Sequence, residues 1–293
     1  MSIVLLSLCS LYSYAFSDPW AISIDAGLTM TQNAYSDNWT GGENGSANWM
    51  FLSNSLLEKQ INPKVHNKNV LKLQFGQTYT QDKDSKDWGS PEKSNDLIDF
   101  ESIFRFSLGS WADPFASARI ETQFLDKGDP EKSVYINPIT FTESFGAAKV
   151  LVKEEFRDWT VRLGAGLREH VTREMLDPVS GKRETKTSMD GGLEFVNDLR
   201  TPLAGGRIKL QSKLIVFQAL FFSKADDFKG LPNEDYWRAP DINFENTFTA
   251  SITKYLMVNL YTQLLYDKEI DRTGRFKQTL GLGLTWKYER LPE

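Results

Sequence analysis

The sequence predicts an all-β fold, a closed antiparallel transmembrane β-barrel of about 12 strands, and three observations carry this prediction. Apolar and polar residues alternate with a period of two along most of the chain, which is typical of strands with two different faces. Most alternating segments have ten or more residues, enough for a tilted strand to cross a bilayer at roughly 9–11 residues. Short turns and long polar loops alternate between these segments, as in outer-membrane barrels.

Twelve segments show this pattern. Nine are clear: 20–30, 71–80, 98–108, 116–124, 159–170, 207–216, 242–252, 256–266 and 280–288. Three are weaker: 46–58, 139–152 and 187–197. Because lipid offers no partners to backbone amides, the sheet must close, and the last strand is expected to pair with the first.

Composition agrees with this fold and excludes others. A length of 293 residues allows one large all-β domain. The hydrophobic content of 40% and the mean hydropathy of −0.41 exclude a bundle of membrane helices. A net charge of −5 gives no indication of nucleic-acid binding, which requires a basic surface. The single cysteine, Cys9, excludes an intramolecular disulfide and a cysteine-based zinc site.

The one long apolar run stands at the start of the chain, SIVLLSLCSLYSYAF. We expect residues 1–15 to be a signal peptide, because Ser13 and Ala15 place small residues where a signal peptidase reads. The run departs from the usual pattern in having no Lys or Arg before it. Residues 16–293 are then expected to form a single outer-membrane β-barrel domain.

The two faces of the last segment, LGLGLTWKY (280–288), raise the question of which face contacts water. Leucines and two aromatics lie on one face; glycines, a threonine and a lysine lie on the other. A soluble barrel buries its apolar face, whereas a membrane barrel turns that face to lipid. The long strands favour the membrane barrel, as does the gathering of aromatics at predicted strand ends, where headgroups would lie. The expected membrane-interface aromatics are Trp20, Trp111, Trp159, Tyr255, Trp286 and Tyr288.

Loop lengths predict the orientation. Long polar loops are expected near 32–46, 80–96, 125–138, 172–187, 222–240 and 267–275, and shorter turns near 59–68, 109–113, 153–158, 198–206 and 253–255. Barrels of this class place short turns in the periplasm. Both termini are therefore expected to face the periplasm of a bacterial outer membrane.

The polar face of the strands carries many charges. The expected lumen-lining residues are Lys72, Asp99, Glu101, Arg105, Arg119, Glu121, Arg162, Arg168, Arg207, Lys209, Lys213, Glu245 and Lys287. The basic residues from Arg162 to Lys213 could form an electropositive wall that selects ions in a narrow pore. Alternatively, the charges could form a salt-bridge network that closes the lumen.

The sequence gives little support for an enzymatic activity. His66 falls in a predicted turn and His170 has no identifiable nucleophile partner, which a phospholipase would need. Asp99, Glu101 and Glu121 could approach one another as in a protease, but ion pairs with Arg105 and Arg119 on the same or neighbouring strands explain them better. The segment from Asp82 to Asp87 lacks the Gly and terminal Glu of a calcium loop. We therefore predict that the chain is not an enzyme and has no catalytic residues, metal or cofactor.

The first long loop carries a motif, Asn38-Trp39-Thr40-Gly41-Gly42-Glu43-Asn44. Together with segments 71–81, 252–267 and 276–288, this motif resembles an uncharacterised family of bacterial outer-membrane β-barrels, described as a domain of unknown function. The resemblance implies a barrel in a Gram-negative-type outer membrane and brings no known activity. The last segment also resembles the C-terminal signal that barrel-assembly machinery recognises, although five residues, 289–293, follow its last aromatic.

Two functions remain open, and the first is the predicted one. It is a passive channel for small polar or anionic solutes. The other is a non-conducting structural or interaction barrel whose extracellular loops bind a partner protein or a surface polysaccharide, which Trp39, Trp88 and Trp237 in the loops favour. In both cases the expected partners are outer-membrane lipid and, during biogenesis, the barrel-assembly machinery.

Overall fold

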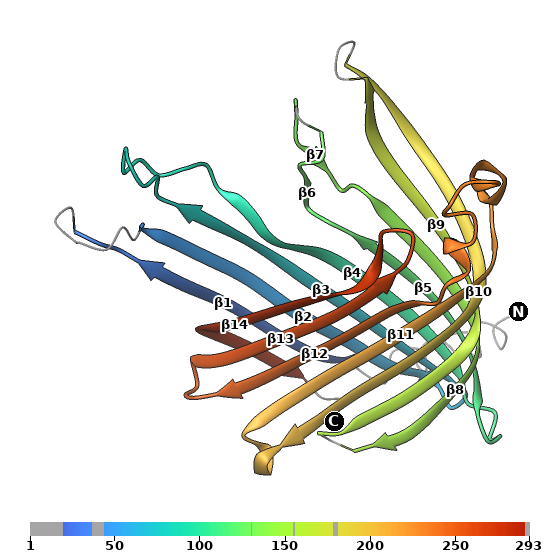
Figure 1. The fold of residues 1–293 in the computed structure, drawn as a ribbon. Helices are drawn as coiled ribbons and strands as arrows, with labels where there is room; N and C mark the ends of the chain where they lie inside the picture. The colour runs from blue at the N-terminus through green and yellow to red at the C-terminus, as the bar shows by residue number, and fades with distance from the viewer. Residues whose placement is uncertain (1–19, 37–43, 130, 155, 178–180, 291–293) are drawn as a thin grey trace, which may run out of the picture.

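Twelve antiparallel strands close into one barrel in the computed structural model, which describes residues 20–36, 44–129, 131–154, 156–177 and 181–290 (Figure 1). The barrel strands are β1 (Ala21–Asn33), β2 (Ser46–Asn62), β3 (Val65–Thr80), β4 (Glu92–Phe106), β5 (Asp113–Thr122), β8 (Ile139–Lys153), β9 (Asp158–Asp177), β10 (Lys182–Leu203), β11 (Ile208–Phe222), β12 (Asp241–Ser251), β13 (Leu256–Asp267) and β14 (Asp271–Arg290). A small hairpin of β6 (Leu125–Asp126) and β7 (Val134–Tyr135) lies between β5 and β8. The predicted fold class is confirmed.

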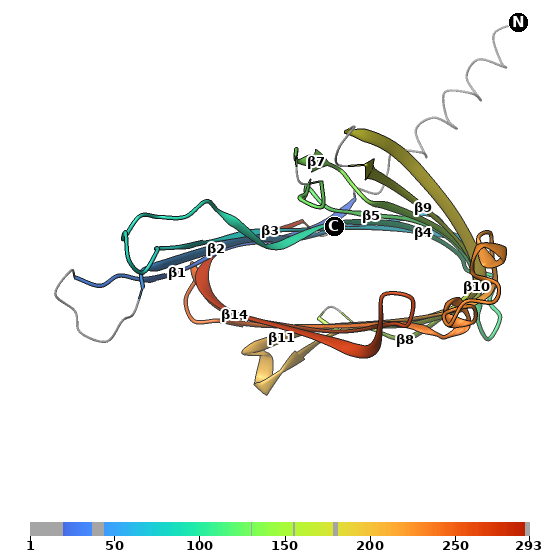
Figure 2. The same cartoon turned by 45° about the horizontal axis from the view of Figure 1, so that its top comes forward.

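Each barrel strand pairs with its neighbour in the chain order, and β14 returns to pair with β1. Figure 2 shows that the barrel is flattened, with β1 to β4 along one long side and β11 to β14 along the other. Flattening brings opposite walls close together, so side chains from non-neighbouring strands can meet inside. In the part of the chain that is described, no helix is long and apolar enough to cross a membrane.

The connections differ between the two ends of the barrel. At one end they are short: 63–64, 107–112, 154–157, 204–207 and 252–255. At the other end most are long: 34–45, 81–91, 123–138 and 223–240, whereas the connections 178–181 and 268–270 are short.

Loops were expected at 172–187 and 267–275, but strands occupy most of both segments. β9 continues to Asp177, and β10 begins at Lys182 with six consecutive exposed residues. Both faces of this extended hairpin meet solvent, so the segment pairs as a strand without the alternation that reveals strands in the sequence.

The outer surface of the barrel is apolar. Leu282 and Leu284 are 55% and 57% exposed, while Gly281 between Leu280 and Leu282 is buried. Leu284 lies beside Leu28, which in turn lies beside Phe51, so the row continues across the β14, β1 and β2 strands. Exposed apolar side chains on the strands include Leu28, Phe51, Phe100, Phe104, Ile120, Phe145, Leu163, Leu167, Leu193, Phe244, Leu264, Phe276, Leu280, Leu282 and Leu284.

The inner surface is polar and closely packed. Buried polar or charged residues outnumber buried apolar ones, and they include Asp99, Glu101, Arg162, Lys213 and Glu245. Glycines on this face allow strands to approach. A Cβ atom added to Gly283 would lie 2.2 Å from the carbonyl oxygen of Leu28, so a larger residue would push β1 away from β14.

Candidate functional site: the ion-paired lumen

Charged side chains from opposite walls meet inside the barrel. Lys72 of β3 places its Nζ 2.9 Å from Oε2 of Glu245 of β12, and Lys209 of β11 lies 2.7 Å from Oδ2 of Asp25 of β1. The paired strands are not neighbours in the sheet, so these contacts pass through the interior. The lumen is therefore crossed by ion pairs on the side of β1, β3, β11 and β12.

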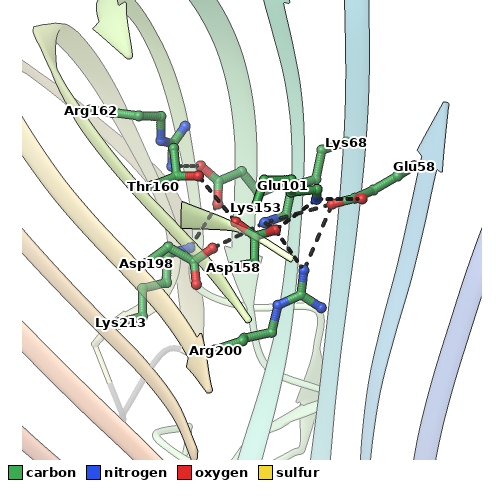
Figure 3. A network of polar contacts seen from close by, with 10 residues as sticks. All are labelled: Glu58, Lys68, Glu101, Lys153, Asp158, Thr160, Arg162, Asp198, Arg200 and Lys213. Atoms are coloured by element: carbon green, nitrogen blue, oxygen red, sulfur yellow. Dashed lines mark hydrogen bonds and ion pairs between the residues drawn. The ribbon is translucent and has the colours of Figure 1, made fainter. Parts of the chain in front are cut away.

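The centre of the lumen holds a three-residue cluster (Figure 3). The Glu101 carboxylate of β4 accepts hydrogen bonds from Arg162 of β9 and from Lys213 of β11, the latter at 2.7 Å. Glu101, Arg162 and Lys213 are only 6%, 5% and 9% exposed. The Arg162 guanidinium also lies 5.3 Å from the Phe115 ring centroid. A single carboxylate thus compensates two buried cations.

A larger cluster lies next to it, toward the short-turn end (Figure 3). Its carboxylates are Glu58, Asp158 and Asp198, and its cations are Lys68, Lys153 and Arg200. Lys153 bridges Glu58 of β2 at 3.1 Å and Asp158 of β9 at 2.9 Å, and Arg200 reaches Asp158 at 3.3 Å. Equal numbers of opposite charges link β2 and β3 to β8, β9 and β10.

Two further groups lie on the wall of β4 and β5. Arg119 donates to Asp99 at 2.7 Å through Nε and also contacts Glu121. Arg105 lies 3.0 Å from Asp113 near the turn between the two strands. Of the three acidic residues considered for catalysis, Asp99 and Glu121 thus contact Arg119, as the ion-pair interpretation expected. Glu101 instead contacts Arg162 and Lys213, and the other expected partner, Arg105, contacts Asp113.

Toward the long-loop end, Arg168 of β9 contacts the Asp190 carboxylate of β10 and lies 2.7 Å from Asp241 of β12. Its guanidinium stacks 3.7 Å from the Phe217 ring centroid. Of the remaining expected lumen residues, Lys287 donates to the Ser251 hydroxyl at 3.1 Å near the rim, and Arg207 lies in the turn before β11. Arg162, Arg168, Lys209 and Lys213 each contact a carboxylate, so these four residues do not form an unpaired positive wall.

A cavity of about 80 Å³ remains between the walls of β1 to β3 and β10 to β13. Asp25, Lys72, Glu245 and Tyr261 are among its lining residues. Because a water molecule needs roughly 10–15 Å³ of such volume, the cavity has room for a few waters beside charged groups that can bind them.

At one place a hydroxyl, an imidazole and a carboxylate lie in a row, as they would in a catalytic triad. The Thr140 hydroxyl lies 3.1 Å from His170 Nδ1, and His170 Nε2 lies 3.7 Å from Asp190. The second distance is too long for a hydrogen bond, and Arg168 already binds the Asp190 carboxylate. This arrangement therefore lacks the oriented base of a nucleophilic triad. No group of three or more His, Cys, Asp or Glu side chains within the described ranges is arranged to hold a metal ion.

The expected interface aromatics lie at the short-turn end. Trp111 and Tyr255 stand in turns, Trp159 follows a turn, and Trp20 precedes β1. Trp286 and Tyr288 stack near the end of β14 with ring centroids 6.3 Å apart. The loop-motif residues Asn38, Trp39, Gly41, Gly42 and Glu43 lie outside the described residues; Asn44 is described and precedes β2.

The opposite end carries a folded platform made of the 223–240 connection and the 268–270 turn. Lys268 and Arg272 lie 4.7 Å and 5.2 Å from the Tyr236 ring centroid, and Trp237 packs 6.2 Å from Phe222. Partial burial and the carboxylates of Asp267, Asp241 and Asp190 raise the pKa of Glu269 to about 7. Since the folded state holds this proton more tightly, the platform loses stability as pH rises from the ordinary glutamate range toward 7.

Comparison with known proteins gives a family match over part of the chain and fold-level likeness over most of it. A family model described as a protein of unknown function (DUF3078) matches residues 30–127, which includes the loop motif. No curated protein sequence matches the chain.

Among solved structures, the chain is similar to the COG4313 outer membrane channel from Pseudomonas putida F1, at 14% identity over 94% of this chain and 98% of that one, with a TM-score of 0.42. The translocator domain of the autotransporter NalP from Neisseria meningitidis shows 10% identity over 98% and 95% of the two chains, with a TM-score of 0.35. The β-domain of the Bordetella autotransporter BrkA shows 12% identity over 93% and 99%, with a TM-score of 0.32.

Proposed function

We propose that this chain is an integral outer-membrane β-barrel whose lumen is closed at rest by ion pairs. Its two termini face the periplasm, and the extended β9–β10 hairpin and the long connections lie outside the cell. The observation that carries the proposal is the inverted distribution of side chains, with an apolar belt outside and charged pairs inside.

The belt is too continuous for a water-soluble monomer. Exposed apolar patches on soluble monomers seldom exceed a few hundred Å², and each buried Å² of apolar surface stabilises by about 25 cal/mol. Here exposed leucines or phenylalanines occur on ten of the twelve barrel strands. Lipid removes this surface from water, and the stacked Trp286 and Tyr288 at the short-turn end suit the headgroup zone.

The cross-lumen pairs favour the non-conducting barrel over the open channel. Opening the centre would leave Arg162 and Lys213 without their shared carboxylate in a desolvated interior, which is costly. The function then lies at the surface. The platform around Tyr236 and Trp237 and the exposed Trp88 offer aromatic rings and cations to a partner protein or a surface polysaccharide.

A passive channel for small polar or anionic solutes is the second candidate. The observation in its favour is the cavity beside Asp25 and Lys72, which offers a polar path on one side of the central cluster.

Purified protein in planar bilayers is expected to show no open conductance steps. Changing Lys209 and Lys213 to Glu places like charges beside Asp25 and Glu101, so the double variant should unfold at a lower temperature on heat-modified gels. Ion-selective steps from the wild-type protein, with a reversal potential that the double variant shifts toward cations, would instead support the channel and contradict the closed lumen.

A further inference from the structure

The seam between the first and last strands is paired over only part of its length. The β1–β14 ladder runs from the Ile22–Arg290 pair to the Thr29–Gly283 pair, which is eight residue pairs. Beyond it, Asp271 and residues 275–282 of β14 pair with β13 alone, and residues 30–33 of β1 pair with β2 alone. Figure 1 shows the β1–β2 and β13–β14 hairpins diverging at this end. Within the described residues, the wall is therefore unpaired here in the half nearer the long loops, a region we call the open seam.

The exposure of β1 agrees with an open seam. Residues 30–33 are all exposed, whichever face they occupy, whereas Gly27 and Thr29 just before them are buried. Thr29 marks the last close contact, because a Cβ added to Gly281 would lie 2.7 Å from its Cγ2 atom. Past this point, within the described residues, β14 has no neighbouring strand on the side of β1.

The outer rim of the open seam is apolar. Met30 on β1 and Phe276, Leu280 and Leu282 on β14 are all exposed. In an outer membrane these side chains contact acyl chains of the outer leaflet. The rim can therefore hold the hydrocarbon part of a lipid next to the opening.

The inner rim carries two cations that make no close ion pair with a described residue. Arg275 and Lys277 share the inward face of β14 with Gly281 and Gly283, because side chains alternate along a strand. Neither makes an ion pair with any residue that the structure describes, unlike the clustered cations of the lumen. The Arg275 Nε atom is buried without a hydrogen-bond partner, and Lys277 Nζ lies 6.0 Å from the Tyr261 ring centroid.

We propose that the open seam binds an anionic amphiphile from the outer leaflet. Its acyl chains lie against Met30, Phe276 and Leu280, and its phosphate or carboxylate head enters between the strands to reach Arg275 and Lys277. The open seam offers an apolar surface for the acyl chains and two cations for the head group. A guanidinium can bind a phosphate or carboxylate through two parallel hydrogen bonds. The proposal rests on the membrane placement proposed above and adds a ligand class to it.

Lipid selectivity in liposomes tests the site. The protein is reconstituted in phosphatidylcholine with trace spin-labelled phosphatidic acid, stearic acid or phosphatidylcholine, and the motionally restricted fraction of each label is measured by electron spin resonance. We expect the wild type to prefer the anionic labels. The R275Q/K277Q variant should lose about tenfold or more of that preference, because a hydrogen bond to a charged group contributes roughly 1.5–3 kcal/mol.

The matched control is Lys287→Gln, which removes an inward cation from the far end of the same strand and should keep the preference.

A second variant tests access rather than charge. Met30 and Leu282 are the next positions in the register after Thr29 and Gly283, so an oxidised M30C/L282C disulfide, with Cys9 replaced by Ser, should close the seam and lower anionic binding. Reduction should restore it.

The outcomes separate the two proposals. Equal restriction of all three labels by inserted wild-type protein, or equal loss in K287Q and R275Q/K277Q, would overturn the lipid site alone. Failure of the wild type to insert into liposomes would overturn the membrane placement itself. A preference for only one anionic label supports the site and identifies its head group as phosphate or carboxylate.

Discussion

Replacing Glu101 with Gln is expected to lower the free energy of unfolding by about 3–5 kcal/mol, because breaking a buried ion pair leaves an uncompensated charge. Glu101 is the carboxylate shared by Arg162 and Lys213, and all three side chains are almost fully buried. These three residues lie on β4, β9 and β11, so the loss loosens contacts between the two long sides of the barrel. Denaturant unfolding in neutral-detergent micelles measures the change.

The matched control is Glu174→Gln. Glu174 pairs with Lys186 at 2.6 Å on the extended β9–β10 hairpin, where both side chains are well exposed. Exposed pairs contribute about 0–1 kcal/mol, so this variant should unfold nearly as the wild type does. Equal, small effects of the two substitutions would mean that the central cluster is hydrated and that the lumen is not closed there.

Leu163→Arg is expected to destabilise the barrel by about 2–4 kcal/mol, the cost of a cation on the lipid face near the bilayer midplane. Leu163 is 59% exposed on β9, four residues after the interface aromatic Trp159. A belt of about 25 Å and roughly 2.3 Å of depth per tilted residue place it near the middle of the membrane. Unfolding of protein folded in liposomes gives the measurement.

Ile270→Arg provides the comparison. Ile270 is 67% exposed but lies in the turn between β13 and β14, outside the belt. Surface substitutions in water usually change stability by about 0.5 kcal/mol or less. If Leu163→Arg were as mild as Ile270→Arg, the belt would be facing water rather than lipid.

The sequence predicts the barrel well where the membrane constrains it. Leu280, Leu282 and Leu284 must face lipid while Gly281 and Gly283 face the lumen, so the period-two pattern carries through to the structure. The same reasoning fails beyond the membrane. The ends of β9 and β10 have solvent on both faces, so no alternation distinguishes them from a loop.

The lumen, too, could be predicted only in part from the sequence. Strand parity places Lys72, Lys209 and Glu245 on the inner face, but their partners depend on register and flattening. Lys72 and Glu245 lie 173 positions apart in the chain, which no spacing rule could pair. The cluster of Glu58, Lys68, Lys153, Asp158, Asp198 and Arg200 was missed because its members fall in or beside segments expected to be turns. Extending strand parity from Asn54 to Glu58, or from Glu194 to Asp198 and Arg200, would have placed three of them inward.

The most direct test of the proposed membrane placement is whether the outer face of β9 contacts lipid or water. A nitroxide attached at Leu163→Cys, with Cys9 replaced by Ser, is measured in liposomes for collisions with oxygen and with a water-soluble nickel complex; Asp84→Cys in the exposed 81–91 connection serves as the aqueous reference. We expect the label at 163 to collide with oxygen and to be shielded from nickel, and the label at 84 to show the reverse. Nickel access at 163 equal to that at 84 would contradict a barrel embedded in lipid.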